Sequence, residues 1–124
     1  MKTRKWKNKN FLQSLKYAIQ GIKYVFFNER NLKIQLLFAV FAVVVSVFLK
    51  LTDVEWILLC LTIGMVLFAE MLNTAIEIVL DLYSQEYNEN IKIAKDISSG
   101  AVLLTSIMSV AIGGILWIPK IVNF

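Results

Sequence analysis

The sequence predicts an all-α integral membrane protein. We expect one N-terminal amphipathic helix on the membrane surface and then three transmembrane helices, all within a single membrane domain, residues 1–124. Two observations predict this fold class. Hydrophobic residues make up 58% of the 124 residues and the mean hydropathy is +0.67, whereas a soluble domain is about 45–50% apolar. The apolar residues also form three runs, each long enough for the roughly 20 residues that a membrane crossing needs.

The three apolar runs place the transmembrane helices. They cover about residues 32–50, 54–82 and 97–118, and Pro119 is expected to close the third. The first run starts too far from the N-terminus to be a short cleaved signal sequence, so we expect the chain to be uncleaved. Three spans are few to enclose a polar site on every side, and this predicts an oligomer.

The segment before the first run, about residues 8–27, has a different pattern. Its apolar residues recur at helical spacing, while basic and amide side chains face elsewhere. The apolar set is Phe11, Leu12, Leu15, Ile19, Ile22 and Phe26, against Gln13, Lys16, Gln20 and Lys23. This pattern is typical of a helix that lies in the membrane interface. The alternative is a helix that caps the bundle through ordinary packing.

The basic residues predict the orientation. Most of them precede or open the first span: Lys2, Arg4, Lys5, Lys7, Lys9, Lys16, Lys23, Arg30 and Lys33. The second loop, about residues 83–96, adds Lys92 and Lys95. Basic residues favour the cytoplasmic side, so we expect the N-terminus and this loop in the cytoplasm of a bacterial cell. A basic arm beside anionic lipid explains the net charge of +4 better than nucleic-acid binding, for which there is no motif.

A stripe of polar residues runs along the second span, in the stretch "AEMLNTAIEIVLDL". A helix turns about 100° per residue, so the stripe occupies an arc of about 100°. Its members are Glu70, Asn73, Thr74, Glu77 and Asp81. At about 1.5 Å per residue, Glu70 lies roughly 21 Å from the outer end of the span. That places Glu70 in the inner third of a bilayer core about 30 Å thick, with Glu77 near the cytoplasmic boundary.

Ionisable residues inside a span are costly and are sites by default. Glu70 therefore predicts function, whereas Asn73 alone is also compatible with interhelical hydrogen bonding, and Asp81 with a solvated helix end. Glu29 and Glu77 are expected at the same level, where two carboxylates suit Mg²⁺, and Lys95 could hold phosphate. The chain has no histidine, so acid–base chemistry falls to carboxylates, lysine, tyrosine or water.

The order of these residues resembles a known family. Glu29, then "AEMLNTAIEIVLDL", then "EYNENIKIAKD" is similar to the small prokaryotic lipid kinases of the diacylglycerol kinase family, which includes the undecaprenol kinases of Gram-positive bacteria. The core pattern, E-x-x-N-x-x-x-E-x-x-x-D followed by A-K-D, is highly specific, and the match covers nearly the whole chain. The resemblance implies a homotrimer that transfers the γ-phosphate of Mg-ATP to the hydroxyl of a membrane lipid.

The resemblance also implies residue roles. Glu70 matches the general base and Asn73 a polar residue beside it, while Glu29 and Glu77 match the carboxylates that hold the metal on ATP. The remaining nucleotide contacts that it implies are Tyr17, Glu86, Tyr87, Asn88, Lys95 and Asp96. Lys95 is expected to face the phosphates.

Two departures from the family pattern bear on the substrate. The run "NERNLKIQ", with Arg30 and Asn31 after the glutamate, looks more like the undecaprenol branch than the Ala-Phe-Arg-like run of Gram-negative diacylglycerol enzymes. Gln35 and Asn88 stand where histidines are common in the two branches. We expect undecaprenol as substrate, with diacylglycerol as the alternative. A proton-coupled transporter would require an acid near the midplane and inverted repeats, whereas these acids gather at one face and no repeat is evident.

Overall fold

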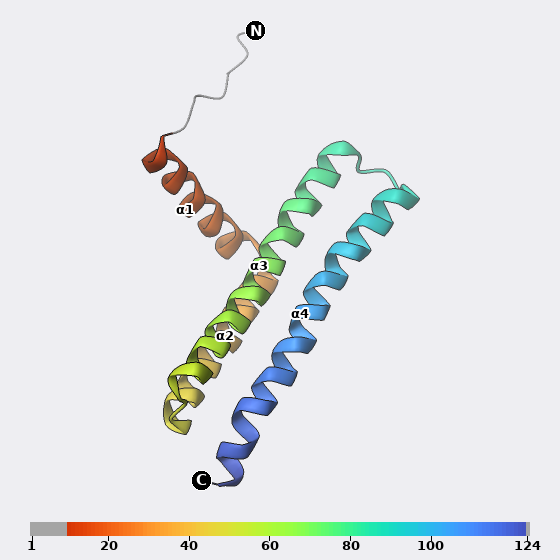
Figure 1. The fold of residues 1–124 in the computed structure, drawn as a ribbon. Coiled ribbons are helices and arrows are strands. Elements are labelled where there is room, and N and C mark those ends of the chain that lie inside the picture. The colour runs from red at the N-terminus through yellow and green to blue at the C-terminus, as the bar shows by residue number, and fades with distance from the viewer. Residues whose placement is uncertain (1–9, 124) are drawn as a thin grey trace.

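The computed structural model describes residues 10–123, which form four helices and no strand. In chain order these are α1 (Phe11–Asn28), α2 (Arg30–Leu49), α3 (Asp53–Tyr83) and α4 (Glu89–Val122) (Figure 1). Helices α2, α3 and α4 are each long and apolar enough to cross a membrane. The predicted fold class, an N-terminal helix followed by three spans, is confirmed, and the trimer stays a prediction.

Helix α1 leads away from the other three helices (Figure 1). It begins at Phe11 because the Asn10 side chain accepts a hydrogen bond from the Gln13 N–H, at 2.8 Å, which satisfies one of the free donors of the first turn. The predicted surface helix therefore starts later than expected and ends at Asn28. Several basic residues of the orientation argument lie outside the described residues: Lys2, Arg4, Lys5, Lys7 and Lys9.

A single extended residue, Glu29, separates α1 from α2. Its φ and ψ are −108° and 114°, and its N–H donates to the carbonyl of Val25, at 2.8 Å. Its own carbonyl accepts from the N–H of Lys33, at 3.4 Å. The Glu29 side chain makes no capping hydrogen bond. The backbone thus carries out both capping tasks, and the carboxylate is left for other partners.

The turn between α2 and α3 is short. Lys50 ends α2 in the left-handed conformation, with φ 55°, and its N–H donates to Val47, at 3.3 Å. Thr52 then caps α3, because its hydroxyl oxygen accepts from the N–H of Glu55, at 3.3 Å. The same hydroxyl donates to Glu55 Oε1, at 2.9 Å. Both hydrogen bonds use the Thr52 hydroxyl, and this side-chain cap fixes the start of α3.

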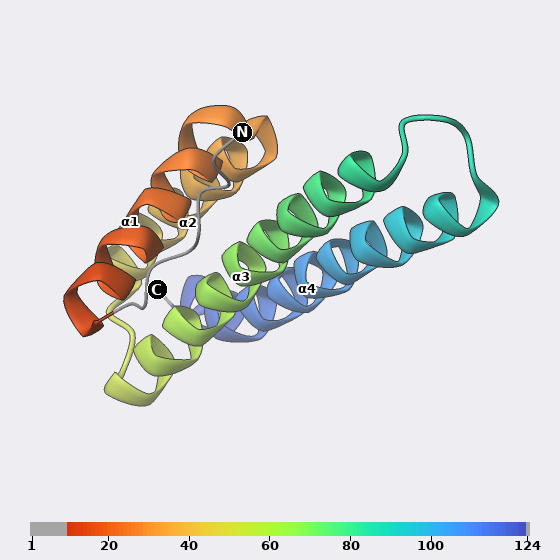
Figure 2. The ribbon, with the colours of Figure 1, turned by 90° about the horizontal axis from the view of Figure 1, so that it is seen from above.

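Helices α3 and α4 run antiparallel, side by side, and form the most extensive helix contact of the described chain (Figures 1 and 2). Both continue past the level where α2 begins. The loop between them covers only residues 84–88, shorter than predicted. Asn88 starts α4 early, because its Oδ1 accepts from the N–H groups of Asn90, at 2.9 Å, and Ile91, at 3.3 Å. Hydropathy had marked only the apolar part of this helix, from residue 97.

Pro119 does not end α4, contrary to the prediction. Proline lacks an N–H and removes one helical hydrogen bond, but the helix continues through it to Val122. The end is set by Asn123 instead. Its backbone N–H donates to the Pro119 carbonyl, at 3.2 Å, and its Nδ2 donates to the same oxygen, at 2.8 Å. The proline therefore lies inside the last turn.

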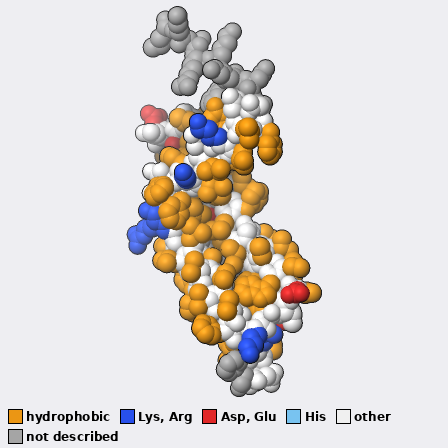
Figure 3. Space-filling view, turned by 90° about the vertical axis from the view of Figure 1, so that its left-hand side faces the viewer, with side chains coloured by type: hydrophobic (Ala, Val, Ile, Leu, Met, Phe, Trp, Pro, Cys, Tyr) orange, Lys and Arg blue, Asp and Glu red, His pale blue; other side chains and the backbone are white. Residues whose placement is uncertain are grey.

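Most of the apolar side-chain surface is exposed. Only 6–22% of the residues in the most apolar stretches of α2, α3 and α4 are buried within the chain. One small core of Leu51, Leu59 and Leu116 packs where the α2–α3 turn meets the end of α4. Figure 3 shows one face, on which hydrophobic side chains dominate over a few charged ones. Lipid or other copies of the chain must cover this surface.

Candidate active site

The carboxylate of Glu70 is the centre of a buried polar cluster. Only 1% of Glu70 is exposed, on the side of α3 that faces the other helices. The Asn31 side chain, from the first turn of α2, lies beside this carboxylate, and Glu29 and Glu77 are close enough for their charges to act on it. Two acids of α3 and one from the link between α1 and α2 thus converge, and like charges so close favour a bound cation.

Glu29 and Glu77 stay a prediction as metal ligands. Both side chains are half-buried, and Glu29 is not used for capping. Within residues 10–123 no group of three or more His, Cys, Asp and Glu side chains is arranged to hold a metal ion. Magnesium commonly takes one or two carboxylates and completes its shell with water and phosphate oxygens. The pair therefore suits a magnesium ion that arrives with a nucleotide.

A hydrogen-bonded relay connects α4 to this cluster. Ser98 Oγ donates to Asn73 Oδ1, at 2.7 Å, and Asn73 Nδ2 donates to Glu77 Oε1, at 3.4 Å. Ser98 and Asn73 are both buried. Sequence reasoning missed Ser98. The available signal was its position three residues after Lys95, which puts the two on one face of α4.

Lys95 is held on the exposed side of the cluster. Its Nζ forms an ion pair with Asp81 Oδ1, at 2.8 Å, and the two side chains are 39% and 53% exposed. Lys95 is also near enough to Glu77 for their charges to interact. Asp81 therefore has a specific partner and is more than a solvated helix end. A pair this exposed is weak, so phosphate could displace Asp81. Asp96 pairs with Lys92 instead, at 2.6 Å.

The other predicted nucleotide contacts lie on α1 and in the α3–α4 loop. Tyr17 is on α1, about half exposed. Glu86, Tyr87 and Asn88 are in the α3–α4 loop, which starts 14 residues after Glu70, or about 20 Å along the helix. There the Tyr87 hydroxyl donates to Glu89 Oε2, at 2.6 Å. That hydrogen bond raises the pKa of Tyr87, so the phenol remains a donor at neutral pH.

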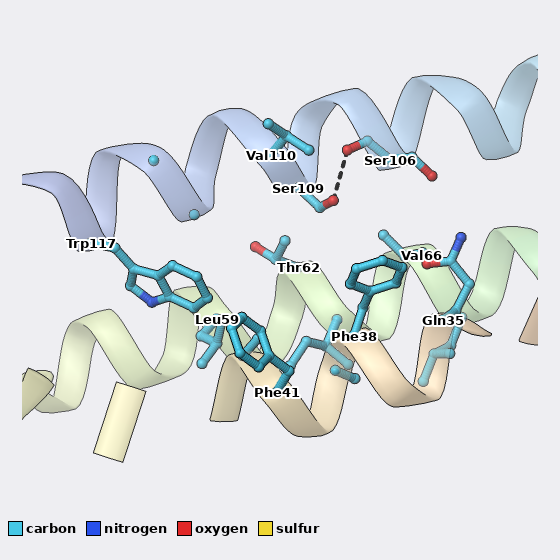
Figure 4. A pocket seen from close by; sticks show the side chains of 16 residues that line it. Gln35, Phe38, Phe41, Leu59, Thr62, Val66, Ser106, Ser109, Val110 and Trp117 are labelled. Atoms are coloured by element: carbon cyan, nitrogen blue, oxygen red, sulfur yellow. Dashed lines mark hydrogen bonds between the residues drawn. The ribbon is translucent and has the colours of Figure 1, made fainter. Parts of the chain in front are cut away.

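An apolar groove of about 550 Å³ opens between α2, α3 and α4 (Figure 4). Gln35 and Val66 lie at one end and Trp117 at the other. Val66 is one helical turn from Glu70 on α3, so the Gln35 end is close to the acid cluster. The hydroxyls of Thr62 and Ser109, inside the groove, donate to carbonyls of their own helices, at 2.6 and 2.7 Å. Gln35 and Ser106 also line the groove, so few donors remain inside it.

Comparisons with known proteins agree with the geometry. A family model described as prokaryotic diacylglycerol kinase matches residues 16–117, which include every acid of the cluster. A diacylglycerol kinase of Synechocystis sp. is 40% identical over 115 residues, covering 92% of this chain and 66% of that protein. An undecaprenol kinase of Bacillus subtilis is 32% identical over 111 residues, covering 90% of each. A diacylglycerol kinase of Haemophilus influenzae is 33% identical over 109 residues, covering 87% of this chain and 92% of that protein.

Proposed function

The chain belongs to the prokaryotic diacylglycerol kinase family, and we propose that within this family it phosphorylates undecaprenol. It is an ATP-dependent lipid kinase, a transferase with an alcohol acceptor, and a bacterial membrane protein. The observation that carries the substrate proposal is the apolar groove that ends one helical turn from the buried Glu70.

Glu70 acts as the general base. Its carboxylate accepts the proton of the lipid hydroxyl, and the lipid oxygen forms a bond to the γ-phosphorus of ATP. The bond from that phosphorus to the β–γ bridging oxygen breaks, and ADP leaves. Such a base contributes about 10²–10⁴-fold. Burial among helices keeps water away from Glu70, and Asn31 beside it orients the carboxylate.

Glu29 and Glu77 would hold the magnesium ion of ATP, which would supply neutralisation of the charge on the phosphates. Lys95 exchanges Asp81 for a phosphate oxygen, and Asp96 contacts the nucleotide next to it. The nucleotide site is completed by Tyr17, Glu86, Tyr87 and Asn88. A second copy of the chain is needed to bring the loop residues to Glu70, because the α3–α4 loop of one chain starts about 20 Å along α3 from Glu70.

The groove supports a polyisoprenoid chain as its occupant. Undecaprenol has one hydrocarbon chain and one hydroxyl, so the chain can fill the groove while the hydroxyl reaches Glu70. Diacylglycerol has two chains and two ester groups, whose carbonyls need donors. The Thr62 and Ser109 hydroxyls are already bonded to their own helices. The run Glu29-Arg30-Asn31, whose Asn31 lies beside Glu70, adds to this preference.

Diacylglycerol is the second candidate. One observation favours it: the Synechocystis relative at 40% identity is named a diacylglycerol kinase. The two hydrocarbon chains of diacylglycerol would then lie partly in the groove and partly in the surrounding lipid. Gln35, at the end of the groove nearest Glu70, and Ser106, also in the lining, would be the available donors to ester carbonyls.

The test offers both lipids to the purified protein. Transfer of labelled γ-phosphate from Mg-ATP is measured with undecaprenol and diacylglycerol in parallel, in matched mixed micelles. We expect kcat/KM to be at least about 10-fold higher for undecaprenol, a difference of the size that pocket shape and polar mismatch produce. A preference for diacylglycerol would overturn the substrate proposal, and no transfer to either lipid would overturn the kinase assignment.

We also propose a homotrimer with its N-terminus and active site in the cytoplasm. The exposed apolar surface and the separation of Tyr17 and the loop from Glu70 support an oligomer. Native mass spectrometry of the protein released from detergent should give three times the 14.2 kDa of one chain. A cysteine-free variant with a new cysteine at Ser84 should react with a membrane-impermeant maleimide only after cells are opened. Labelling of intact cells would contradict the proposed cytoplasmic position of this loop.

A further inference from the structure

Ser98 is a buried polar residue outside the set of acids that the kinase reaction uses directly. It is only 6% exposed, on the side of α4 that packs against α3. Its hydroxyl reaches across the helix contact to Asn73, 25 residues away in the chain, at 2.7 Å. The next residue, Ser99, is exposed. One of two adjacent serines is therefore committed to the cluster and the other is not.

The direction of this relay follows from the chemistry of its last member. An ionised carboxylate accepts hydrogen bonds and cannot donate them. The amino group of the Asn73 amide must therefore face Glu77, as it does, at 3.4 Å. The amide carbonyl then faces Ser98, whose hydroxyl is its donor. With the amide reversed, a carbonyl oxygen would face the carboxylate and the amino group would lose that acceptor.

We propose that Ser98 is a positioning residue for the metal–nucleotide site. By donating to Asn73 Oδ1, it fixes the orientation of the amide, and the amide then holds Oε1 of Glu77. The other oxygen of Glu77 remains for the cation. The inference rests on the proposed function in one respect, namely that Glu77 holds the magnesium of ATP. Partners one step removed from a metal ligand typically change metal affinity by about 10–100-fold.

The relay also explains why a hydroxyl is buried at this contact. Without Ser98 the Asn73 carbonyl would be a buried acceptor with no partner, which favours rotation of the amide. Rotation would release Glu77 Oε1 and allow the carboxylate to change its position. A serine that served packing alone would need only its small size, and alanine would replace it at no cost to the cation.

The experiment uses the full chain in detergent and compares Ser98→Ala, Ser98→Thr and Ser99→Ala. Binding of Mn²⁺ with a non-hydrolysable ATP analogue is followed by electron paramagnetic resonance, and the KM for lipid is measured separately. Ser98→Ala should weaken Mn²⁺–nucleotide binding by about 10-fold and leave the lipid KM unchanged. Ser98→Thr, which keeps the hydroxyl, should retain most of the binding. The control Ser99→Ala should bind as the wild type does.

A double-mutant cycle separates the relay from a general loosening of the helix contact. In an Asn73→Ala background, Ser98→Ala should cause no further loss of Mn²⁺ binding, because the two residues act through one path. Equal losses in both backgrounds would overturn the proposal, as would wild-type binding by Ser98→Ala. If Ser98→Ala fails to fold, Ser98→Cys, which keeps the size but is a weak donor, takes its place with the same expectation.

The outcome distinguishes this inference from the proposed function. If the wild-type protein binds no Mn²⁺–nucleotide and transfers no phosphate, the proposed kinase site is wrong. A wild-type protein that does both, with Ser98→Ala identical to it, would leave the kinase intact and remove only the role of Ser98.

Discussion

The two halves of the α3–α4 pair use polar side chains in different ways. In the apolar half, residues 53–69 and 99–122, polar groups meet complementary partners: Trp117 Nε1 donates to the fully buried Ser46, at 3.0 Å, and Lys120 pairs with Glu55, at 3.2 Å. In the polar half, residues 70–83 and 89–98, Glu70 has two further acids for neighbours. Pairing of a donor with an acceptor, or of a cation with an anion, stabilises a helix contact. Convergence of like charges costs stability and indicates a site for a cation and its ligand.

The largest expected effect comes from removing the charge at the centre of the polar half. Glu70→Gln keeps the shape of the side chain but cannot accept the proton of the lipid alcohol. We expect kcat to fall by about 10²–10⁴-fold, measured as labelled phosphate transferred to lipid, with the helix content unchanged by circular dichroism. The matched variant in the apolar half, Glu55→Gln, should keep its kcat. Comparable losses of kcat in the two variants would contradict the proposed difference between the two halves.

The next largest effect concerns the metal. Glu77→Gln removes a proposed ligand, so the Mg²⁺ concentration for half-maximal activity should rise by roughly 100-fold, the upper end of what loss of a supporting partner causes. The control is Asp81→Asn, one helical turn further along α3, which breaks only the exposed ion pair with Lys95. Its Mg²⁺ dependence should change little. A Glu77→Gln enzyme with wild-type Mg²⁺ dependence would argue against Glu77 as a ligand.

A smaller effect tests the groove of the apolar half. A Cβ added at Gly113 meets no atom within 4 Å, so Gly113→Leu has room for its Cβ and should place the rest of its side chain in the groove. We expect the KM for the lipid to rise about 10-fold with the KM for ATP unchanged. Gly64, on α3, is equally open but does not line the groove. If Gly64→Leu and Gly113→Leu behave alike, the groove does not hold the lipid.

The smallest effect compares one substitution in the two halves. Ser46→Ala leaves the Trp117 N–H without its partner and should lower the free energy of unfolding by about 0.5–1 kcal/mol, while nucleotide binding stays as in the wild type. Ser98→Ala, unlike Ser46→Ala, should weaken Mn²⁺–nucleotide binding. Thermal unfolding in detergent and the binding assay, run on both variants, give the comparison. A loss of Mn²⁺–nucleotide binding in Ser46→Ala would contradict it.

The sequence predicts the helices well because hydropathy and helical periodicity are strong signals in a membrane chain. Three apolar runs become α2, α3 and α4, and the stripe from Glu70 to Asp81 does share one face. The ends were predicted less well. Asn88 starts α4 and Asn123 ends it through local hydrogen bonds, and hydropathy does not register those. Pro119 shows that a helix breaker near a terminus costs too little to stop the helix there.

The sequence predicted the charged members of the candidate site and Asn73, and it missed Ser98 and the position of Asn31. Glu29, Glu70 and Glu77 stand out because acids are rare in such sequences. Ser98 and Asn31 do not, because small polar residues are common in membrane helices. Their roles depend on which face of α4 meets α3 and on where α2 begins, and both are tertiary facts. The direction in which α1 leads away from the other helices (Figure 1) is likewise a tertiary fact.

The most direct test of the account measures Mn²⁺–nucleotide binding and phosphate transfer together in Glu70→Gln and Glu77→Gln. The central claim is that one face of α3 carries the base and, two turns further on, a metal ligand. Glu70→Gln should then bind Mn²⁺ with the ATP analogue as tightly as the wild type and transfer phosphate about 10²–10⁴-fold more slowly, whereas Glu77→Gln should bind it poorly. Normal transfer by Glu70→Gln, or normal binding by Glu77→Gln, would contradict the claim.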